Sequence, residues 1–210
     1  MKEKIKEFFK QKYYKPIIVF ICLILTLEIV GDLFANEVMK KDIIGYKIIS
    51  KYLISDFVTP IAKFITNFGG VIRLIFITTI LLIFIKNKLI KIYIVLNLAI
   101  SGILNQILKN IVQRPRPTEF RLIDEKGYSF PSGHSMVSAA FHGFLIYLIF
   151  KNVKNKYLKW ISIILLTILI ILIGISRIYL GVHYTSDVLA GFLISISYLI
   201  IFTSIVNDYL

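Results

Sequence analysis

The sequence predicts an all-α integral membrane protein, a single domain over residues 1–210 built as a bundle of six transmembrane helices. Three observations support this class. Hydrophobic residues make up 57% of the 210 residues, and the mean hydropathy is +0.79. They come in long blocks, and charged residues collect where the blocks end. A soluble domain of this size has no use for so much apolar sequence, whereas spanning helices require it.

Each apolar block runs for about 15 to 20 residues or more, close to the roughly 20 residues that one spanning helix needs. The exact ends of such blocks are less well determined than their number. The six predicted spans are Ile17–Phe34, Gly70–Ile85, Leu89–Leu108, His134–Phe150, Leu158–Ile175 and Tyr184–Val206.

The formal charge of +13 comes from basic residues that flank these blocks. Because there is no separate basic domain, the charge indicates membrane flanks rather than nucleic-acid binding. Lysines are dense in the N-terminal segment 1–16 and in the short loops 86–91 and 151–159, which predicts that both termini are cytoplasmic. No A-x-A-like cleavage site follows the first block, so it is interpreted as an uncleaved anchor. The single cysteine, Cys22, excludes a disulfide within the chain.

Two outer segments separate the spans in this topology. In residues 35–69, apolar Ile44, Ile48 and Tyr52 recur at helical spacing, so the stretch Asp42–Leu53 is expected to form an interfacial helix on the outer leaflet, with an ordered loop as the alternative. Gly69 and Gly70 mark a break before the second span.

The second outer segment, residues 109–133, contains three prolines and cannot be one continuous helix. It also holds two of three polar clusters, Lys109–Pro117 and Pro131–His134. The third cluster, Ser176–Asp187, falls on the same predicted side of the membrane. We expect the three clusters to form one site.

His183 and Asp187 are the candidate reacting pair. They are four residues apart, and on a helix they would share a face. A carboxylate beside an imidazole fixes its tautomer and stabilises the cation that forms when the other nitrogen attacks. The pair therefore predicts nucleophilic catalysis by His183.

The tripeptide Ser132-Gly133-His134 stands where the fourth apolar block begins. Free backbone N–H groups at a helix N-terminus favour anions, and a glycine lets the backbone approach a ligand closely. His134 is the remaining candidate for the acid that protonates a leaving oxygen.

Three cations, Lys109, Arg116 and Arg177, complete the predicted site. A phosphoryl group in transfer spreads negative charge over its equatorial oxygens, which positioned cations stabilise. Each cation also has a simpler interpretation as a snorkelling or interfacial anchor, and Asp187 as a helix cap. We favour the catalytic interpretation because all these groups face one compartment.

The order Lys-x6-Arg-Pro, Pro-Ser-Gly-His and Ser-Arg-x5-His-x3-Asp resembles the three-part signature of the type 2 phosphatidic acid phosphatase (PAP2) family. The resemblance implies that His183 forms a phosphohistidine, Asp187 orients it, and His134 protonates the leaving group and later helps to activate water. The residues that it implies for holding phosphate are Lys109, Arg116, Ser132, Gly133 and Arg177. It implies no metal and no cofactor, and the sequence has no cluster at metal-ligand spacing.

Several polar residues are left without an assigned role. His142 lies within the fourth block, Glu28 and Asp32 lie near the outer end of the first, and Tyr179 and Tyr184 could be interface aromatics. Charged residues of the loop could shape headgroup choice: Arg114, Glu119, Arg121, Asp124, Glu125 and Lys126.

The function expected from the resemblance is hydrolysis of a lipid phosphate at the outer leaflet. Candidate substrates are undecaprenyl diphosphate, phosphatidylglycerophosphate and phosphatidic acid. The alternatives are a phosphotransferase that passes the phosphoryl group to a lipid hydroxyl, and a non-enzymatic lipid-binding or transport protein. The family also includes soluble vanadium-dependent haloperoxidases, so vanadate is expected to inhibit. The oligomeric state is left open.

Overall fold

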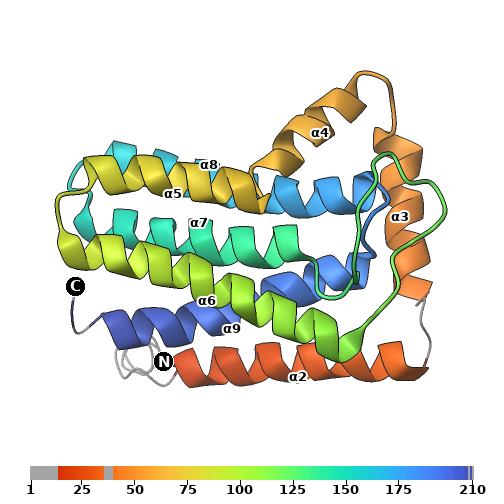
Figure 1. Ribbon diagram of the computed structural model, residues 1–210, viewed down its shortest axis with the longest axis horizontal. Helices are drawn as coiled ribbons and strands as arrows, with labels where there is room; N and C mark the ends of the chain where they lie inside the picture. Colours follow the sequence, from red (N-terminus) through yellow and green to blue (C-terminus); the bar gives the residue numbers. More distant parts are fainter. Residues whose placement is uncertain (1–13, 36–39, 208, 210) are drawn as a thin grey trace, which may run out of the picture.

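The computed structural model describes residues 14–35, 40–207 and 209, apart from the side chain of Lys51. Most of the predicted cytoplasmic N-terminal segment therefore lies outside the described residues. Within them every regular element is a helix, as predicted (Figure 1). The helices are α2 (Tyr14–Ala35), α3 (Lys40–Leu53), α4 (Val58–Asn67), α5 (Val71–Phe84), α6 (Lys88–Val112), α7 (Gly133–Asn152), α8 (Lys156–Tyr179) and α9 (Thr185–Val206).

Helix α7 is the central element of the bundle. It packs against α6, α8 and α9, and α2 packs on the other side of α9 (Figure 1). An aromatic and aliphatic core joins α5, α6, α7 and α9 through Leu74, Ile94, Phe141, Phe144 and Phe202. Because α7 is surrounded, its first turn is held in a fixed position at one end of the bundle.

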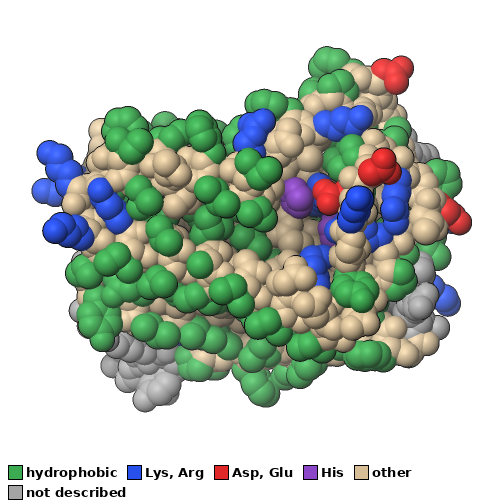
Figure 2. Space-filling view, in the orientation of Figure 1, with side chains coloured by type: hydrophobic (Ala, Val, Ile, Leu, Met, Phe, Trp, Pro, Cys, Tyr) green, Lys and Arg blue, Asp and Glu red, His purple; other side chains and the backbone are tan. Residues whose placement is uncertain are grey.

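The outer faces of the bundle are apolar, and Figure 2 shows large hydrophobic side chains spread over one of them. Leu27, Ile72 and Ile103 are 68%, 83% and 61% exposed. Faces of this extent require lipid rather than water around them. Five helices are long and apolar enough to span a bilayer, namely α2, α6, α7, α8 and α9. The chain is therefore a multi-pass membrane protein.

The second predicted span, Gly70–Ile85, coincides with α5, but the length of this helix leaves the count of six spans unconfirmed. Helix α5 has 14 residues and is about 21 Å long, short of the roughly 30 Å of a hydrocarbon core. It reaches the length of a span only together with α4, to which it is joined at a bend of 56°. The helices thus give five spans, or six if the bent pair counts as one.

The bend occurs at Gly69 and Gly70, where the sequence predicts a break. A Cβ on Gly69 would come within 2.6 Å of Ile173 Cγ2 and 3.2 Å of the His134 backbone oxygen. The absence of a side chain therefore lets the chain turn against α7 and α8 beside His134.

Helix α3 begins at Lys40, two residues before the predicted start. Ile44, Ile48 and Tyr52 are exposed, as the helical spacing predicts, whereas Asp42 is buried. The helix is present; its location on the outer leaflet stays a prediction. Helix α4, which follows α3 within the same outer segment, was not predicted from the sequence.

Two helices run further than the apolar blocks indicated. Helix α6 continues to Val112 and α8 to Tyr179, beyond the predicted ends at Leu108 and Ile175. As a result, Lys109 and Arg177 project from the last turns of helices, where basic residues are favoured by the helix dipole.

Candidate active site

The three predicted polar clusters meet at one end of the bundle. The C-terminal ends of α6 and α8, the N-terminal ends of α7 and α9 and the loop 113–132 converge there, at the right of Figure 1. Figure 2 shows arginine, lysine, acidic and histidine side chains gathered at this end, whereas the middle of the face is largely apolar and the opposite end carries only Lys and Arg among charged side chains. The expectation that the clusters form one site agrees with this arrangement.

His183 lies in the tight turn between α8 and α9. Gly181 has a φ of +68° in this turn, and a Cβ there would come within 2.4 Å of the backbone oxygen of Phe120. Only glycine fits both conditions. His183 therefore precedes α9 rather than lying on it, which corrects the assumption that it shares a helical face with Asp187.

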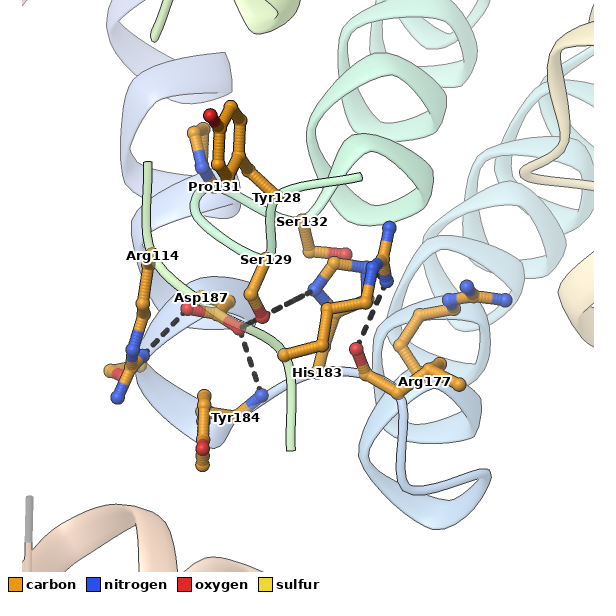
Figure 3. Close-up of polar contacts among 12 residues, drawn as sticks. Arg114, Tyr128, Ser129, Pro131, Ser132, Arg177, His183, Tyr184 and Asp187 are labelled. Atoms are coloured by element: carbon orange, nitrogen blue, oxygen red, sulfur yellow. Dashed lines mark hydrogen bonds and ion pairs between the residues drawn. The ribbon is translucent and has the colours of Figure 1, made fainter. Parts of the chain in front are cut away.

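The two residues nonetheless meet, because the turn folds His183 back over the first turn of α9. Its Nδ1 lies 3.4 Å from Asp187 Oδ2 and 3.3 Å from Ser129 Oγ (Figure 3). The backbone N–H of Tyr184 also donates to Asp187 Oδ2 at 2.9 Å. Asp187 thus caps α9 and orients the imidazole at the same time.

The other ring nitrogen of His183 faces a cation. Nε2 lies 3.0 Å from Arg116 Nη1, and the His183 side chain is almost fully buried. Burial lowers the pKa of His183 to about 4; Asp187 opposes this shift, and Arg177 and Arg116 add to it. The imidazole is therefore neutral at pH 7. With a proton on Nδ1 for Asp187, the lone pair lies on Nε2, where it accepts from Arg116 Nη1.

Arg116 is held by the backbone of the loop and the turn. Its Nε donates to Gly127 at 3.0 Å, Nη1 to Val182 at 3.0 Å and Nη2 to Lys126 at 3.1 Å. These carbonyl oxygens fix the guanidinium in front of His183. Arg116 is therefore placed to hold a phosphate oxygen next to the attacking nitrogen.

Arg177 is 1% exposed and enters the site from α8. Its Nη1 donates to Thr66 Oγ1 at 2.7 Å and its Nη2 to Glu125 Oε1 at 2.6 Å. Among the described residues its Nε has no hydrogen-bond partner. One N–H of this guanidinium is therefore unused in the site.

Glu125 is a site residue that the sequence analysis did not assign. Its Oε2 also lies 4.0 Å from Arg116 Nη2, so its carboxylate bridges two of the predicted phosphate-binding cations. Burial acts to raise the pKa of Glu125, but Arg177 and Arg116 outweigh it and the pKa is lowered. The carboxylate of Glu125 thus already pairs with Arg116 and Arg177, which supports their suitability for binding the anionic phosphate.

Lys109 approaches the same space from α6. Its Nζ donates to the backbone oxygens of Tyr128 and of Ser129, the latter at 3.4 Å. These bonds hold the ammonium against the part of the loop that contains Ser129, whose hydroxyl contacts His183. The ammonium of Lys109 is thus directed at the loop beside His183, as the predicted site role requires.

The start of α7 differs in part from what was expected. The backbone N–H of Ser132 is not free but donates to the Asp187 oxygen at 3.1 Å, and its hydroxyl caps the helix by accepting from Ser135. In the part of the chain that the structure describes, the N–H groups of Gly133 and His134 have no acceptor. These two remain available to an anion.

Gly133 also has a packing role that the sequence did not reveal. A Cβ at this position would come within 2.9 Å of Asn105 Oδ1, and Asn105 in turn donates to the Pro131 oxygen at 3.2 Å. The glycine therefore brings α7 close to α6. His134 follows it and faces the α4–α5 bend, where a Cβ on Gly70 would be 3.6 Å from His134 Nε2.

Behind Asp187 lies a buried ion-pair network that was also missed. Arg114 Nη1 donates to Asp187 Oδ1 at 2.7 Å and its Nη2 to Asp42 Oδ2 at 2.8 Å. The partners are 73 and 72 residues away in the chain, so no local pattern could reveal them. Arg114 also stacks on Tyr184, with its Cζ 3.9 Å from the ring centre.

Three of the other unassigned residues, His142, Asp32 and Tyr179, lie outside this site. His142 is eight residues beyond His134 on α7, about 12 Å deeper, and bonds to the Ser138 oxygen at 2.9 Å. Asp32 pairs with Lys41 at 2.9 Å on the surface. Tyr179 contacts Thr59 at 2.7 Å through its hydroxyl and fastens α4 to α8.

A cavity of about 690 Å³ lies on the α3 side of His183. Tyr46, Phe120 and Ile178 are among its lining residues, together with His183. None of the predicted phosphate-binding cations lines it. Among the described residues, no three histidine, cysteine, aspartate or glutamate side chains gather at metal-binding distance.

Comparison with known proteins agrees with this geometry. The PAP2 superfamily model matches residues 90–209, which cover more than half of the chain and include every predicted site residue. Phosphatidylglycerophosphatase B of Bacillus subtilis is 37% identical over 91 residues, which are 43% of this chain and 45% of that protein. The chain thus matches less than half the length of that relative. An undecaprenyl-diphosphatase of Sulfolobus acidocaldarius is 28% identical over 88% of this chain and 87% of its own.

Solved structures extend the similarity to the whole bundle. The transmembrane PAP2-type phosphatidylglycerolphosphate phosphatase from Bacillus subtilis matches with a TM-score of 0.82 and 27% identity, covering 93% of this chain and 97% of that one. Aquifex aeolicus LpxE matches with a TM-score of 0.61 and 26% identity over 76% of this chain and 92% of that one. The family match and the shared bundle together establish that this chain is a membrane-embedded member of the PAP2 superfamily.

Proposed function

We propose that this protein is a metal-independent phosphatase that hydrolyses a lipid phosphate or diphosphate through a phosphohistidine on His183. The observation that carries the proposal is the placement of His183. Its neutral Nε2 faces Arg116 at 3.0 Å, while Asp187 lies 3.4 Å from Nδ1. Mere anion binding would need the cations but not an imidazole prepared for attack.

In the first step, Nε2 of His183 attacks phosphorus and the bond from phosphorus to the leaving oxygen breaks. This oxygen stays on the lipid of a monoester, or on the inner phosphate of a diphosphate. His134 passes a proton to the leaving oxygen, and a monoanionic phosphate can bring that proton into the site. Asp187 stabilises the positive charge on the imidazole ring. The equatorial oxygens are held by the cations Lys109, Arg116 and Arg177 and by the free N–H groups of Gly133 and His134.

In the second step, His134 has lost its proton and can act as a base. It takes a proton from a water that attacks phosphorus, and the bond from phosphorus to Nε2 breaks. Inorganic phosphate leaves and His183 returns to its neutral state. If a lipid hydroxyl replaced the water, the same step would transfer the phosphoryl group instead.

The membrane setting and the relatives support a lipid as the substrate. The named relatives act on phosphatidylglycerophosphate and undecaprenyl diphosphate, and sphingosine-1-phosphate phosphatase 1 of Rattus norvegicus is 32% identical over 50% of this chain. The lysine-rich loops 86–91 and 151–159 lie at the end of the bundle opposite the site. By the positive-inside rule they support an extracytoplasmic active site and cytoplasmic termini.

The proposal is tested by measuring phosphate release from detergent-purified protein with EDTA present. The panel contains phosphatidic acid, phosphatidylglycerophosphate, undecaprenyl diphosphate and sphingosine-1-phosphate. We expect release from at least one lipid, inhibition by vanadate, and none from a folded His183→Gln variant. Activity that disappears with EDTA, or that persists in this variant, would contradict the proposal. Label recovered on a lipid hydroxyl instead of in free phosphate would identify a phosphotransferase.

A further inference from the structure

The ion-pair network behind the catalytic pair connects it to α3, a helix outside the matched family region. Asp42 on α3 and Arg114 in the loop have side chains only 0% and 3% exposed. Buried charges of this kind are costly unless they are paired. Arg114 divides its two Nη groups between Asp42 and Asp187, at 2.8 Å and 2.7 Å. One guanidinium therefore neutralises two buried carboxylates.

Both carboxylates also contact the first turn of α9. Asp42 Oδ1 accepts from the backbone N–H of Ser186 at 2.8 Å, and Asp187 Oδ2 accepts from that of Tyr184 at 2.9 Å. Arg114 Nη1 donates to Ser186 Oγ at 2.8 Å as well. Asp42 thus fastens α3 to the turn that carries His183 and holds Arg114 against Asp187.

The two carboxylate oxygens of Asp187 have different partners. Oδ1 is held by Arg114, whereas Oδ2 faces His183 Nδ1 at 3.4 Å. Without Arg114 only Oδ2 would be held, by the Tyr184 N–H and the Ser129 hydroxyl, and the orientation of the carboxylate and of the imidazole would be less firmly fixed.

We propose that Asp42 and Arg114 are positioning residues for the His183–Asp187 pair, and that α3 is therefore a working part of the active site. This inference rests on the proposed phosphatase function. Neither residue reaches the space in front of Nε2, because Arg114 lies on the far side of Asp187 from His183 (Figure 3). Their effect is on the rate of attack, and the phosphate-binding cations are left intact.

The kinetic test compares wild type, Asp42→Asn and Arg114→Gln with the matched control Asp32→Asn, whose carboxylate belongs to an exposed ion pair. The substrate is the lipid phosphate that wild type hydrolyses fastest. We expect kcat to fall about 10- to 100-fold in the two network variants, as misplacement of a reacting group does. The inhibition constant of inorganic phosphate should not change, and Asp32→Asn should match wild type.

A second measurement does not depend on turnover. The chain has three histidines, so the pKa of His183 can be followed by NMR of ¹⁵N-labelled histidine side chains. Removing the negative charge of Asp42 should lower the pKa of His183, whereas removing the positive charge of Arg114 should raise it. The other charged groups around His183 stay in place in both variants: Lys109, Arg116, Glu125, His134, Arg177 and Asp187.

Opposite pKa shifts together with a selective loss of kcat would support the inference. A role in stability alone predicts lost folded protein with an unchanged kcat per folded molecule and an unchanged His183 titration, and that result would overturn it. If wild type hydrolysed no lipid phosphate, the proposed function would fail. The NMR shifts would still decide whether the network acts on His183.

Discussion

The imidazole of His183 is kept neutral by burial even though a carboxylate lies beside it. Burial and the positive charges of Arg116 and Arg177 lower the pKa of His183 by more than Asp187 raises it. In many histidine–carboxylate pairs the carboxylate raises the imidazole pKa instead. Here the cations proposed to bind phosphate add to the effect of burial on the pKa of His183, so the proposed binding and reactivity depend in part on the same charges.

This balance predicts the pH range over which His183 is neutral. Its pKa is about 4, below the ordinary imidazole value, so its protonated form prevails only below about pH 4. The NMR signals of His183, assigned by their loss in His183→Gln, should therefore stay those of the neutral ring from pH 8 down to about pH 5. A His183 titration centred near the ordinary value of about 6.5 would contradict this account of the site.

Arg177 uses the shape of its guanidinium as well as its charge. Two of its nitrogens hold Thr66 and Glu125, and the third is unpaired among the described residues. A lysine keeps the charge but cannot make these bonds from one ammonium. We expect Arg177→Lys to lower kcat/KM by about 10²–10³, the loss typical of one transition-state donor.

The matched control for this variant is Arg73→Lys, because Arg73 is an exposed arginine on α5. It should leave kcat/KM unchanged, as surface substitutions usually do. Equal effects of the two substitutions on phosphate release would mean that Arg177 acts only as a charge at a distance.

At this scale the sequence predicted which residues gather at the site better than the contacts between them. The His183–Asp187 contact was expected, but from a shared helical face, whereas His183 lies in the preceding turn. Arg114 and Glu125 could not be assigned, because their partners come from α3, α8 and α9 and depend on the tertiary fold. Spacing within a motif carries no information about such distant pairs.

At the scale of elements, the α4–α5 bend connects the outer segment 35–69 with His134, the proposed acid. Gly69 and Gly70 allow α4 to turn away while His134 packs against the break. Thr66, in the last turn of α4, also accepts from Arg177 at 2.7 Å. The bend therefore places two elements of the site, and a change in its geometry should affect both.

Gly69→Ala tests this role of the bend. The added methyl would meet Ile173 Cγ2 at 2.6 Å, so α4 or α8 must move. We expect the free energy of unfolding to fall by about 1–3 kcal/mol, as overpacking does, and kcat to fall with it. Thermal unfolding in detergent and phosphate release measure the two effects.

The matched control is Gly102→Ala on α6, where an added Cβ meets nothing within 4 Å. Alanine should be tolerated there and should favour the helix by up to about 1 kcal/mol. If Gly102→Ala lowered activity as much as Gly69→Ala, the effect could not be assigned to the bend.

Hydropathy identified all of the long helices because lipid requires continuous apolar surface over about 20 residues. It failed where polar and apolar residues share one short helix. Helix α4 was missed, and α5 is too short to span alone. The predicted ends of α6 and α8 were too early because Lys109 and Arg177 are charged. Both residues nonetheless lie in the last helical turn, where hydrogen bonds to other residues of the site hold their side chains.

At the scale of the whole molecule, the catalytic end and the lysine-rich loops lie at opposite ends of the bundle (Figure 1). This arrangement is what an enzyme with cytoplasmic termini and an outward-facing site requires. Because the single cysteine Cys22 is buried at 6% exposure, the chain suits labelling of introduced cysteines.

The orientation predicts which exposed positions react from outside the cell. Thr118→Cys in the catalytic loop should be labelled in intact cells by a membrane-impermeant maleimide. Lys154→Cys, in the loop at the opposite end, should react only after the cells are permeabilised. The reverse pattern would place the active site in the cytoplasm and would contradict the proposed localisation.

The central claim is that His183 forms a covalent bond with phosphorus. It is tested most directly with a ³²P-labelled lipid phosphate, quenched in alkali during the first turnovers. Phosphohistidine survives alkali and is lost in acid, unlike a phosphoserine. We predict alkali-stable, acid-labile label on wild type and none on folded His183→Gln. Label retained by that variant, or wild-type turnover with no labelled protein at any quench time, would contradict the account.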